Sequence, residues 1–431
     1  MNQTFCSVLS IVASHSCTFY RYAALSLIIV FTSCNFTAKS NNDTAKTDTT
    51  KMFLPVPGVL PKQTFQRLHH AVEGWYDSAL RSKSFNGGIV VAKNGQIVFE
   101  DYNGNAHVGG TDAITDSTSF HIASVSKTFT AMAVLKLWQE GKFSIDDEYS
   151  KFFPQFNYPG LTIRNLLSHR SGLPNYLYFM EDLGWDKKTF ITNQDVLDYL
   201  INRKSELTNI SSPGTHFAYC NTNYALLALL VEKISGKKFG DYLHDNFFGP
   251  LQMKHTFVYS SKDSATAIPS YDYRGRIIPM NFLDHVYGDK NVYSTPRDLL
   301  AWDQALTHGV LFNEKTLAEA YAPYSNEKPG IRNYGLGWRM NNYPTGKKMI
   351  YHNGWWHGNN ASFIRLVQDS ATIIVLGNKY DRGIYHANRL ADIFGNYLGS
   401  KEEDEPENNE KQEGETSTVA PKKKTVLKHA K

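Results

Sequence analysis

A serine followed three residues later by a lysine, Ser124 and Lys127, stands where a long apolar helix pattern begins. Apolar residues recur at helical spacing after this pair until Gly141 ends the pattern. Because helix positions three apart lie on one face, the lysine amine can lie beside the serine hydroxyl without any loop. A serine hydroxyl is a weak nucleophile until a neighbouring base takes its proton. The pair therefore predicts a nucleophile and its base at the N-terminal end of an apolar helix.

The same spacing also occurs at Ser235 and Ser325, so the motif is not specific by itself. Ser235 comes at the end of an apolar helix pattern, and Ser325 is followed by Pro329 and a glycine, which is typical of a loop. Only Ser124 opens an apolar helix. Its alternative role is that of an ordinary N-cap, whose side chain satisfies a free backbone N–H.

Two later segments carry further polar patterns in front of regular elements. Tyr219-Cys220-Asn221 leads into a second apolar helix pattern, residues 225–234. His352-Asn353-Gly354 precedes a strand-like run over residues 361–367. Each of these patterns is weak alone because similar triplets occur elsewhere in the chain. Their order, spacing and flanking residues carry the information.

With these three elements in this order, the chain resembles the serine β-lactamases, penicillin-binding proteins and related esterases. It is most similar to the branch of class C β-lactamases and D-alanyl-D-alanine carboxypeptidases. That family has Ser-x-x-Lys, then Tyr-x-Asn or Ser-x-Asn, then Lys-Thr-Gly or a His-x-Gly variant. Residues 166–174 and 334–338 also look like family segments, and the resemblance extends from about residue 65 to residue 398.

The pattern of elements predicts an α+β fold. The two ends of the body contain the strand patterns, and residues 144–290 read as helices and long loops. One sheet assembled from distant segments should therefore carry an inserted all-helical lobe, with the active site in the groove between them. The resemblance implies the same β-lactamase/transpeptidase-like architecture, an antiparallel sheet flanked by helices. The expected elements are a helix over 63–83, strands over 88–92, 96–99, 334–340, 361–367 and 372–377, and helices over 297–306 and 385–398.

The resemblance implies a catalytic role for each motif residue. Ser124 is the expected nucleophile, and it attacks a carbonyl to form an acyl-enzyme. Lys127 is the expected proton acceptor, alone or together with Tyr219, which then passes the proton to the leaving group. Because the true base in the family is debated, these residues are treated as a coupled set.

The remaining positions are expected to bind the substrate. Asn221 would hold the catalytic lysine and the substrate amide. The backbone N–H groups of Ser124 and Trp355 would form the oxyanion hole, in which each donor is worth roughly 10² to 10³ in rate. Gly354 fits a position where a side chain would crowd the substrate.

His352 is the main departure from the family pattern. A lysine in its place would carry a fixed charge that helps to grip a substrate carboxylate, and a neutral imidazole does not. The change favours esters, amides or peptides that lack this carboxylate, although β-lactamase and carboxypeptidase activity stay open. A structural hydrogen bond is the alternative role of His352. Alternatives for the protein are a penicillin-binding or sensor protein that is acylated but hardly turns over, and a surface adhesion module.

The N-terminus has the pattern of an export signal. An arginine, an apolar run and small residues precede Cys34, so residues 1–33 resemble a lipoprotein signal peptide and Cys34 is the expected lipidated residue. A plain secretory signal is the alternative. We expect a flexible tether over 34–60, the hydrolase domain over 61–399 and a disordered charged tail over 400–431. The expected location is the bacterial cell envelope, with a lipid anchor in a membrane.

Composition limits the possible partners. A net charge of +4 over 431 residues gives no reason to expect nucleic acid. The sequence shows no cluster with metal-ligand spacing, no phosphate loop and no dinucleotide fingerprint, so neither a metal nor a cofactor is expected. Cys220 is interpreted as a small packing residue. The expected partner is a small-molecule or peptide substrate, and the sequence indicates nothing about the oligomeric state.

Overall fold

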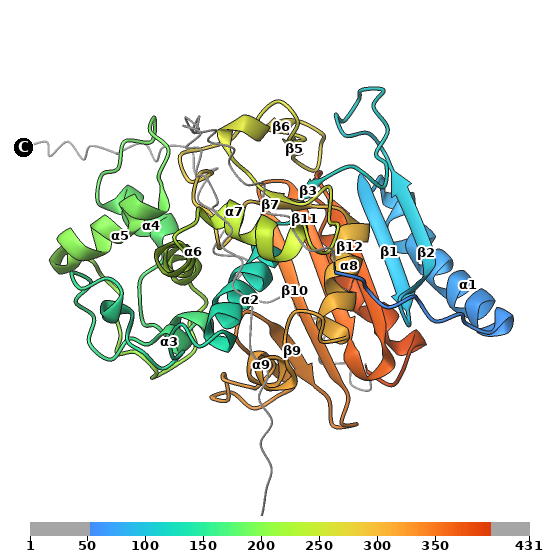
Figure 1. Cartoon of the computed structure of the whole chain (residues 1–431). Coiled ribbons are helices and arrows are strands. Elements are labelled where there is room, and N and C mark those ends of the chain that lie inside the picture. Colours follow the sequence, from blue (N-terminus) through green and yellow to red (C-terminus); the bar gives the residue numbers. More distant parts are fainter. Residues whose placement is uncertain (1–51, 398–431) are drawn as a thin grey trace, which may run out of the picture. The chain divides into compact units, whose positions relative to one another are not determined.

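A computed structural model describes residues 52–397, which belong to one compact unit (Figure 1). Their largest sheet has the strand order β2-β1-β12-β11-β10-β9-β8, and every neighbouring pair in it is antiparallel. The strands are β1 (Gly87–Lys93), β2 (Gln96–Asn103), β8 (Arg332–Tyr334), β9 (Arg339–Asn342), β10 (Lys348–Trp356), β11 (Asn359–Leu366) and β12 (Ala371–Gly377).

The first and the last strand of the domain, β1 and β12, pair inside this sheet. Strand β1 pairs with β12, with Gly87 opposite Gly377 and Lys93 opposite Ala371. The β1–β2 hairpin turns at Asn94 and Gly95, both at positive φ, as the Asn-Gly pair predicts. The expected sheet of distant segments and the α+β fold class are thus confirmed.

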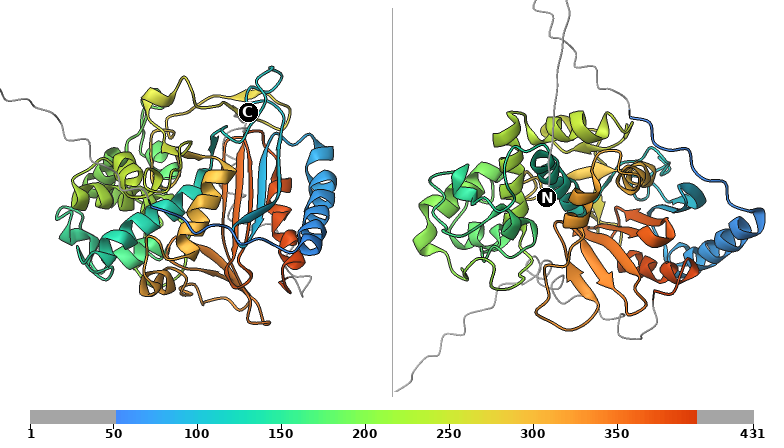
Figure 2. Two further views of the ribbon diagram at one scale, coloured as in Figure 1. Left: turned by 45° about the vertical axis from the view of Figure 1, so that its right-hand side comes forward. Right: turned by 60° about the horizontal axis from the view of Figure 1, so that its bottom comes forward.

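Side chains alternate along the strands and separate two apolar layers. Ile89 and Val91 pack with α1 (Lys62–Ala79) and with the 3₁₀ segment Arg382–Ile393. The residues between them belong to the other layer, under α8 (Pro296–Thr307) and α2 (Ser126–Gln139). The left view of Figure 2 shows α1 and the red C-terminal segment together on one side of the strands and α8 on the other.

Helix α2 lies at the centre of the larger core. Eleven of its residues are buried, on all sides of the helix. Such a helix must be enclosed, and here it packs against α6 (Asn221–Ser235) and α9 (Glu314–Ala320), while the 3₁₀ turn directly before it contacts β10 and β11 of the sheet. The first turn of α2 is therefore held between the sheet and the helical lobe.

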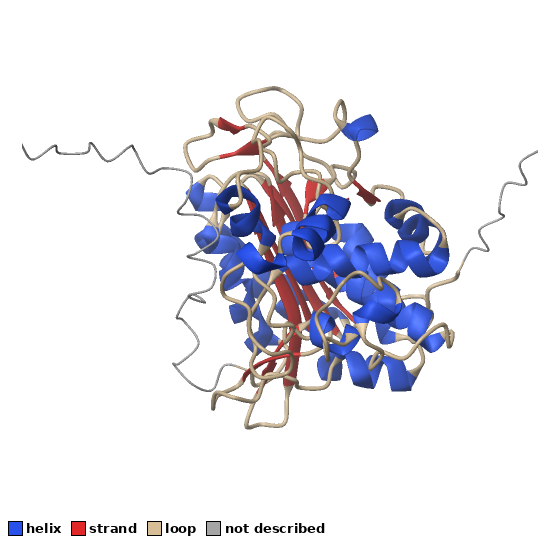
Figure 3. Ribbon diagram, turned by 90° about the vertical axis from the view of Figure 1, so that its left-hand side faces the viewer, coloured by secondary structure: helices blue, strands red, loops and turns tan. Residues whose placement is uncertain are grey.

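The helical lobe lies in front of the strands in Figure 3. After its helices the chain continues through loops and three two-residue strands, β4 (Phe257–Val258), β5 (Ser270–Tyr271) and β6 (Ile277–Ile278). The lobe is thus mainly but not entirely helical. Its helices are α3 (Ile163–Leu167), α4 (Tyr176–Asp182), α5 (Asn193–Asn202), α6 and α7 (Phe239–Leu243). Short strands β3 (Phe120–His121) and β7 (Val292–Ser294) form a second small sheet with β4, and α9 spans Glu314–Ala320.

Two expected elements differ in the structure, and one strand was not expected. The strand expected over 334–340 is two strands, because a turn with Gly337 at a φ of +85° separates β8 from β9. The closing helix expected over 385–398 is a 3₁₀ segment that already begins at Arg382. Strand β10 was not expected as a strand.

The tether expected over residues 34–60 has contacts at its end. Gly58 donates its N–H to the Asn94 carbonyl at 3.0 Å, and Leu60 donates its N–H to Gln96 at 2.8 Å. The segment that follows residue 52 therefore lies along the domain. The expected signal peptide, Cys34 and the tail over 400–431 lie outside the described residues. Within the described part of the chain, no helix is long and apolar enough to span a bilayer.

Gly337 provides a test of this packing. A Cβ atom there would lie 2.2 Å from the Ala131 Cβ, whereas one at Gly346, with a similar φ of +81°, would meet nothing within 4 Å. Gly346→Ala should cost about 1 kcal/mol from backbone strain alone. Gly337→Ala should cost about 1–3 kcal/mol more, because it overpacks the α2 contact. Urea unfolding of both variants measures the difference, and equal losses would contradict the packing argument.

Candidate active site

Ser124 lies in a 3₁₀ turn, Ala123–Val125, directly before α2. Ala123 adopts a φ of +47°, which is rare for a residue with a side chain. The N-cap residue of α2 is Val125, and no side chain caps this helix. Ser124 therefore does not act as an N-cap, and its half-buried hydroxyl is directed to another partner.

That partner is Lys127, whose Nζ donates a hydrogen bond to the Ser124 Oγ at 3.0 Å. The lysine is fully buried, and its Nζ also donates to the main-chain oxygen of Asp289 at 2.8 Å. The spacing in the sequence predicted the first contact. The second contact comes from a loop far along the chain and no motif indicates it.

Tyr219 lies against the same ammonium group. The centroid of its ring is 5.0 Å from the Lys127 Nζ. The centroid of the His169 ring lies 4.3 Å from the centroid of the Tyr219 ring. The His169 carbonyl accepts the Ala218 N–H and its Nδ1 accepts the Cys220 N–H, so this histidine holds the main chain on both sides of Tyr219. His169 therefore orders the loop that carries Tyr219.

Strand β10 passes directly beside the Ser124 turn at Gly354. A Cβ atom at this position would lie 2.3 Å from the Ile122 carbonyl oxygen and 3.0 Å from the Ser124 nitrogen. Both are backbone atoms, so only glycine allows this approach. The strand was missed because its residues 352–356 are polar, glycine and aromatic instead of alternating. The close approach brings the third motif, on strand β10, beside the first motif at Ser124.

The two tryptophans after Gly354 point to opposite faces of the strand. Trp356 shares the face of Gly354, and its indole N–H donates to Asp284. Trp355 is on the other face, where its indole N–H donates to the His357 carbonyl at 2.7 Å. Only the Trp356 side chain can therefore border the Ser124 side of the sheet. In the expected oxyanion hole, Trp355 would contribute its backbone N–H and not its side chain.

His352 is fully buried beside this group. Its Nδ1 lies 2.6 Å from the Asn353 carbonyl oxygen and its Nε2 lies 3.3 Å from the Tyr334 hydroxyl. Because a carbonyl can only accept, Nδ1 carries the proton and Nε2 accepts from the tyrosine. Burial, and then the charges of Arg339 and Lys127, lower the pKa of His352 well below its ordinary value. The imidazole is neutral, so this position offers no fixed charge.

Two further residues complete the site. Arg339 was not indicated by any motif, yet its guanidinium carbon lies 5.0 Å from the centroid of the Tyr219 ring. Asn221 is the first residue of α6 and is buried, and its expected contacts stay a prediction.

Cys220 is buried with its thiol directed at the Leu173 carbonyl, and burial raises the thiol pKa to about 11. A thiol in this state is a poor nucleophile, which supports its interpretation as a packing residue.

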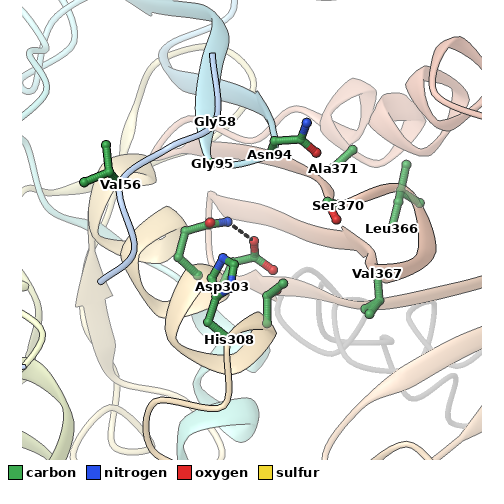
Figure 4. Close-up of a pocket in the computed structure, with 12 residues that line it drawn as sticks. Val56, Gly58, Asn94, Gly95, Asp303, His308, Leu366, Val367, Ser370 and Ala371 are labelled. Carbon is green, nitrogen blue, oxygen red and sulfur yellow. Dashed lines mark hydrogen bonds between the residues drawn. The ribbon is translucent and has the colours of Figure 1, made fainter. Parts of the chain in front are cut away.

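A separate cavity of about 340 Å³ lies elsewhere in the domain (Figure 4). It lies between the β1–β2 turn, the end of α8, the β11–β12 connection and the segment around Gly58. None of the motif residues lines it, so it is not part of the site around Ser124.

The buried histidine gives a pH prediction. In the unfolded chain His352 takes up a proton near pH 6.5, whereas in the folded chain it stays neutral, so stability falls as pH decreases below about 6.5. Between pH 7.5 and pH 5.5 this one residue should cost about 1.4 kcal/mol. The free energy of unfolding of His352→Gln should therefore fall by about 1.4 kcal/mol less than that of the wild type between these two pH values. Urea unfolding at both pH values measures the difference.

The matched control is His70→Gln, at a side chain that is 75% exposed. This variant should lose as much stability as the wild type between the two pH values. An equal loss in the His352 variant and the wild type would mean that His352 takes up a proton in the folded protein as readily as in the unfolded chain.

Known proteins are similar to this chain in sequence and in fold. The Beta-lactamase family model matches residues 72–393. Penicillin-binding protein 4* of Bacillus subtilis is 32% identical over 312 residues, which cover 68% of this chain and 68% of that protein. A solved penicillin-binding protein of Bacillus halodurans is 25% identical with a TM-score of 0.64, and the match covers 73% of this chain and 98% of that one.

A D-amino acid amidase of Ochrobactrum anthropi SV3 has a TM-score of 0.62 at 22% identity, over 76% of this chain and 97% of that one. This likeness concerns the fold alone. The family match spans most of the chain, and it includes all three motifs, which the fold brings together around Ser124 and Lys127. The chain belongs to the β-lactamase family of serine hydrolases.

Proposed function

We propose that this protein hydrolyses an ester, amide or peptide bond through an acyl-enzyme on Ser124. The observation that carries the proposal is the 3.0 Å hydrogen bond between the Ser124 Oγ and the buried Nζ of Lys127. In the first step the Ser124 Oγ bonds to the substrate carbonyl carbon, and the bond from that carbon to the leaving group breaks. In the second step water attacks the ester, and the acid and free Ser124 are released.

Proton transfer is assigned to Lys127 and Tyr219 together. The proton of the Ser124 hydroxyl moves to this pair, and from it to the leaving group. Two distances support this: the Lys127 Nζ donates a hydrogen bond to the Ser124 Oγ, and it lies 5.0 Å from the centroid of the Tyr219 ring. A general base in such a position contributes roughly 10² to 10⁴ in rate.

The oxyanion is assigned to the backbone N–H groups of Ser124 and Trp355. The contact of Gly354 with the Ile122 carbonyl and the Ser124 nitrogen supports this, because it places strand β10 directly beside the nucleophile. Asn221 is assigned to the substrate amide. Losing one oxyanion donor typically costs 10² to 10³ in rate.

The neutral His352 supports a substrate that needs no charge at this position. A lysine there would attract a substrate carboxylate, and a neutral buried imidazole gives no such attraction. We therefore propose small esters, amides and short peptides as the substrate class. The likeness of the fold to a D-amino acid amidase makes D-amino acid amides a sensible member of the test panel.

We further propose that the protein is exported to the cell envelope and anchored through a lipid on Cys34. The charged, apolar and small-residue pattern before Cys34 supports this. The names of relatives as penicillin-binding proteins agree with an envelope location. Metabolic labelling with an alkyne fatty acid tests it, since Cys34→Ala should lose the label. A variant that keeps the label would exclude this anchor.

The nucleophile is tested with a fluorophosphonate probe. The wild type should be labelled, and Ser124→Ala should not be labelled at all. Lys127→Met should be labelled roughly 10² to 10⁴ times more slowly, because the serine loses its base. The control is Lys136→Met, on the same helix, where the lysine pairs with Glu140. It should label at the wild-type rate, and full labelling of Ser124→Ala would overturn the mechanism.

Turnover is tested on a panel of nitrocefin, a D-alanyl-D-alanine peptide, a D-amino acid amide and short-chain p-nitrophenyl esters. We expect steady hydrolysis of the esters or the amide, and weak or no hydrolysis of the two substrates that carry a carboxylate. A burst of product equal to the enzyme concentration, followed by almost no turnover, would instead identify a penicillin-binding or sensor protein.

A further inference from the structure

The main-chain oxygen of Asp289, like the Ser124 hydroxyl, accepts a hydrogen bond from the Lys127 Nζ. This ammonium donates to the Asp289 carbonyl at 2.8 Å and to the Ser124 hydroxyl at 3.0 Å. The carbonyl comes from residues 281–291, a stretch that forms neither helix nor strand. A loop has no regular ladder of hydrogen bonds to hold its carbonyls in place, so side chains must do this.

The side chain of Asp289 is held by two buried partners. Its Oδ2 accepts a hydrogen bond from the Tyr176 hydroxyl at 2.9 Å and lies 3.5 Å from the Nζ of Lys290. Lys290 also donates a hydrogen bond to the Tyr176 hydroxyl. The side chains of Asp289 and Lys290 are only 2% and 3% exposed, and Tyr176 is fully buried. The three side chains thus form one closed triangle of polar contacts.

This triangle is connected to the other catalytic segments. The Lys290 Nζ lies 4.7 Å from the centroid of the Trp356 ring, on the face of β10 that Gly354 shares. The backbone N–H of Tyr176 donates to the Thr222 hydroxyl at 2.7 Å, in the first turn of α6 just after the Tyr219 motif. The loop around Asp289 is therefore tied both to the strand and to the helix that carry the site.

A buried ion pair by itself adds little to the stability of a fold. Removing two charges from water costs as much as their attraction returns, and well-packed apolar residues often stabilise a core as well or better. A charged triangle directly behind the carbonyl that binds the catalytic lysine is better explained by geometry. Catalysis depends on such geometry, since a displacement of about 1 Å can cost 10²-fold in rate.

We propose that Tyr176, Asp289 and Lys290 form a positioning clamp that holds the Asp289 carbonyl against the Lys127 ammonium. The proposal rests on the proposed function of Lys127 as proton acceptor. The clamp residues act through Lys127 and contact no substrate. Loosening the clamp lets the carbonyl and the Lys127 Nζ move, and the Nζ, which must be a neutral amine to take the proton, then meets the Ser124 hydroxyl less often in the reactive position.

The test is Tyr176→Phe, which removes one hydroxyl and keeps the packing, together with Lys290→Met. On the ester that the wild type hydrolyses best, kcat and the acylation rate should fall about 10- to 100-fold, with KM within about threefold. The matched control is Tyr149→Phe, which removes another fully buried hydroxyl, one that donates to the Leu226 carbonyl at 3.0 Å. It should keep the wild-type kcat. The melting temperature of each variant shows whether it is folded at the temperature of the assay.

A double variant tests whether the residues act as one unit. If they do, Tyr176→Phe combined with Lys290→Met should be no slower than the slower single variant. Rate losses that multiply, or a kcat like that of Tyr149→Phe, would overturn the clamp. A raised KM with unchanged kcat would also overturn it, because Lys290 would then contact the substrate. Failure of the clamp is distinct from failure of the proposed function, which labelling of Ser124→Ala or a burst without turnover in the wild type would show.

Discussion

The buried ammonium of Lys127 is the constraint on which the rest of the site depends. A buried charge is costly unless hydrogen bonds and electron-rich groups replace its water. The protein provides the Ser124 hydroxyl, the Asp289 carbonyl and the rings of Tyr219 and Tyr224, 5.0 and 5.7 Å from the Nζ. These groups come from three distant parts of the chain. The fold therefore has to bring those parts together before the lysine can be buried at all.

Two glycines let the sheet region approach this lysine and the serine. At Gly354 strand β10 touches the backbone of the Ser124 turn, and at Gly337 the turn between β8 and β9 touches α2. A side chain at either place would push the two elements apart. The central position of α2, buried on all sides, makes the approach rigid. A rigid element suits a nucleophile, because catalytic groups must hold their distances.

Much of the scaffold could be predicted because its signals are local. The Asn94-Gly95 turn and the Thr295 cap with Pro296 in the first turn of α8 appear as the patterns indicate. The errors arose where tertiary contacts override the local pattern. Residues 334–340 look like one strand, but Gly337 packs on α2 and breaks it into two. Strand β10 lacks an alternating polar and apolar pattern, because Gly354 allows a close backbone contact instead of contributing a side chain to the core.

The active-site residues, like the scaffold, were only partly predictable from the sequence. The three motifs were visible in the sequence, but the residues that hold and surround them were not. Arg339, Tyr176 and Lys290 lie in no motif, and they become relevant only through contacts with Tyr219 or with Asp289. The sequence also left open whether Ser124 caps the helix, which the position of Val125 as N-cap resolves.

The sequence alone determined the types and order of the motif residues, and from them the family, because a spacing of three on a helix is a local property. The tertiary structure decided the rest. It showed that His352 is neutral, which carbonyl receives the Lys127 ammonium and which of two adjacent tryptophans shares the face of Gly354. These features depend on burial and on charges contributed by residues far apart in the chain. Only the folded arrangement of all neighbours specifies such long-range contacts.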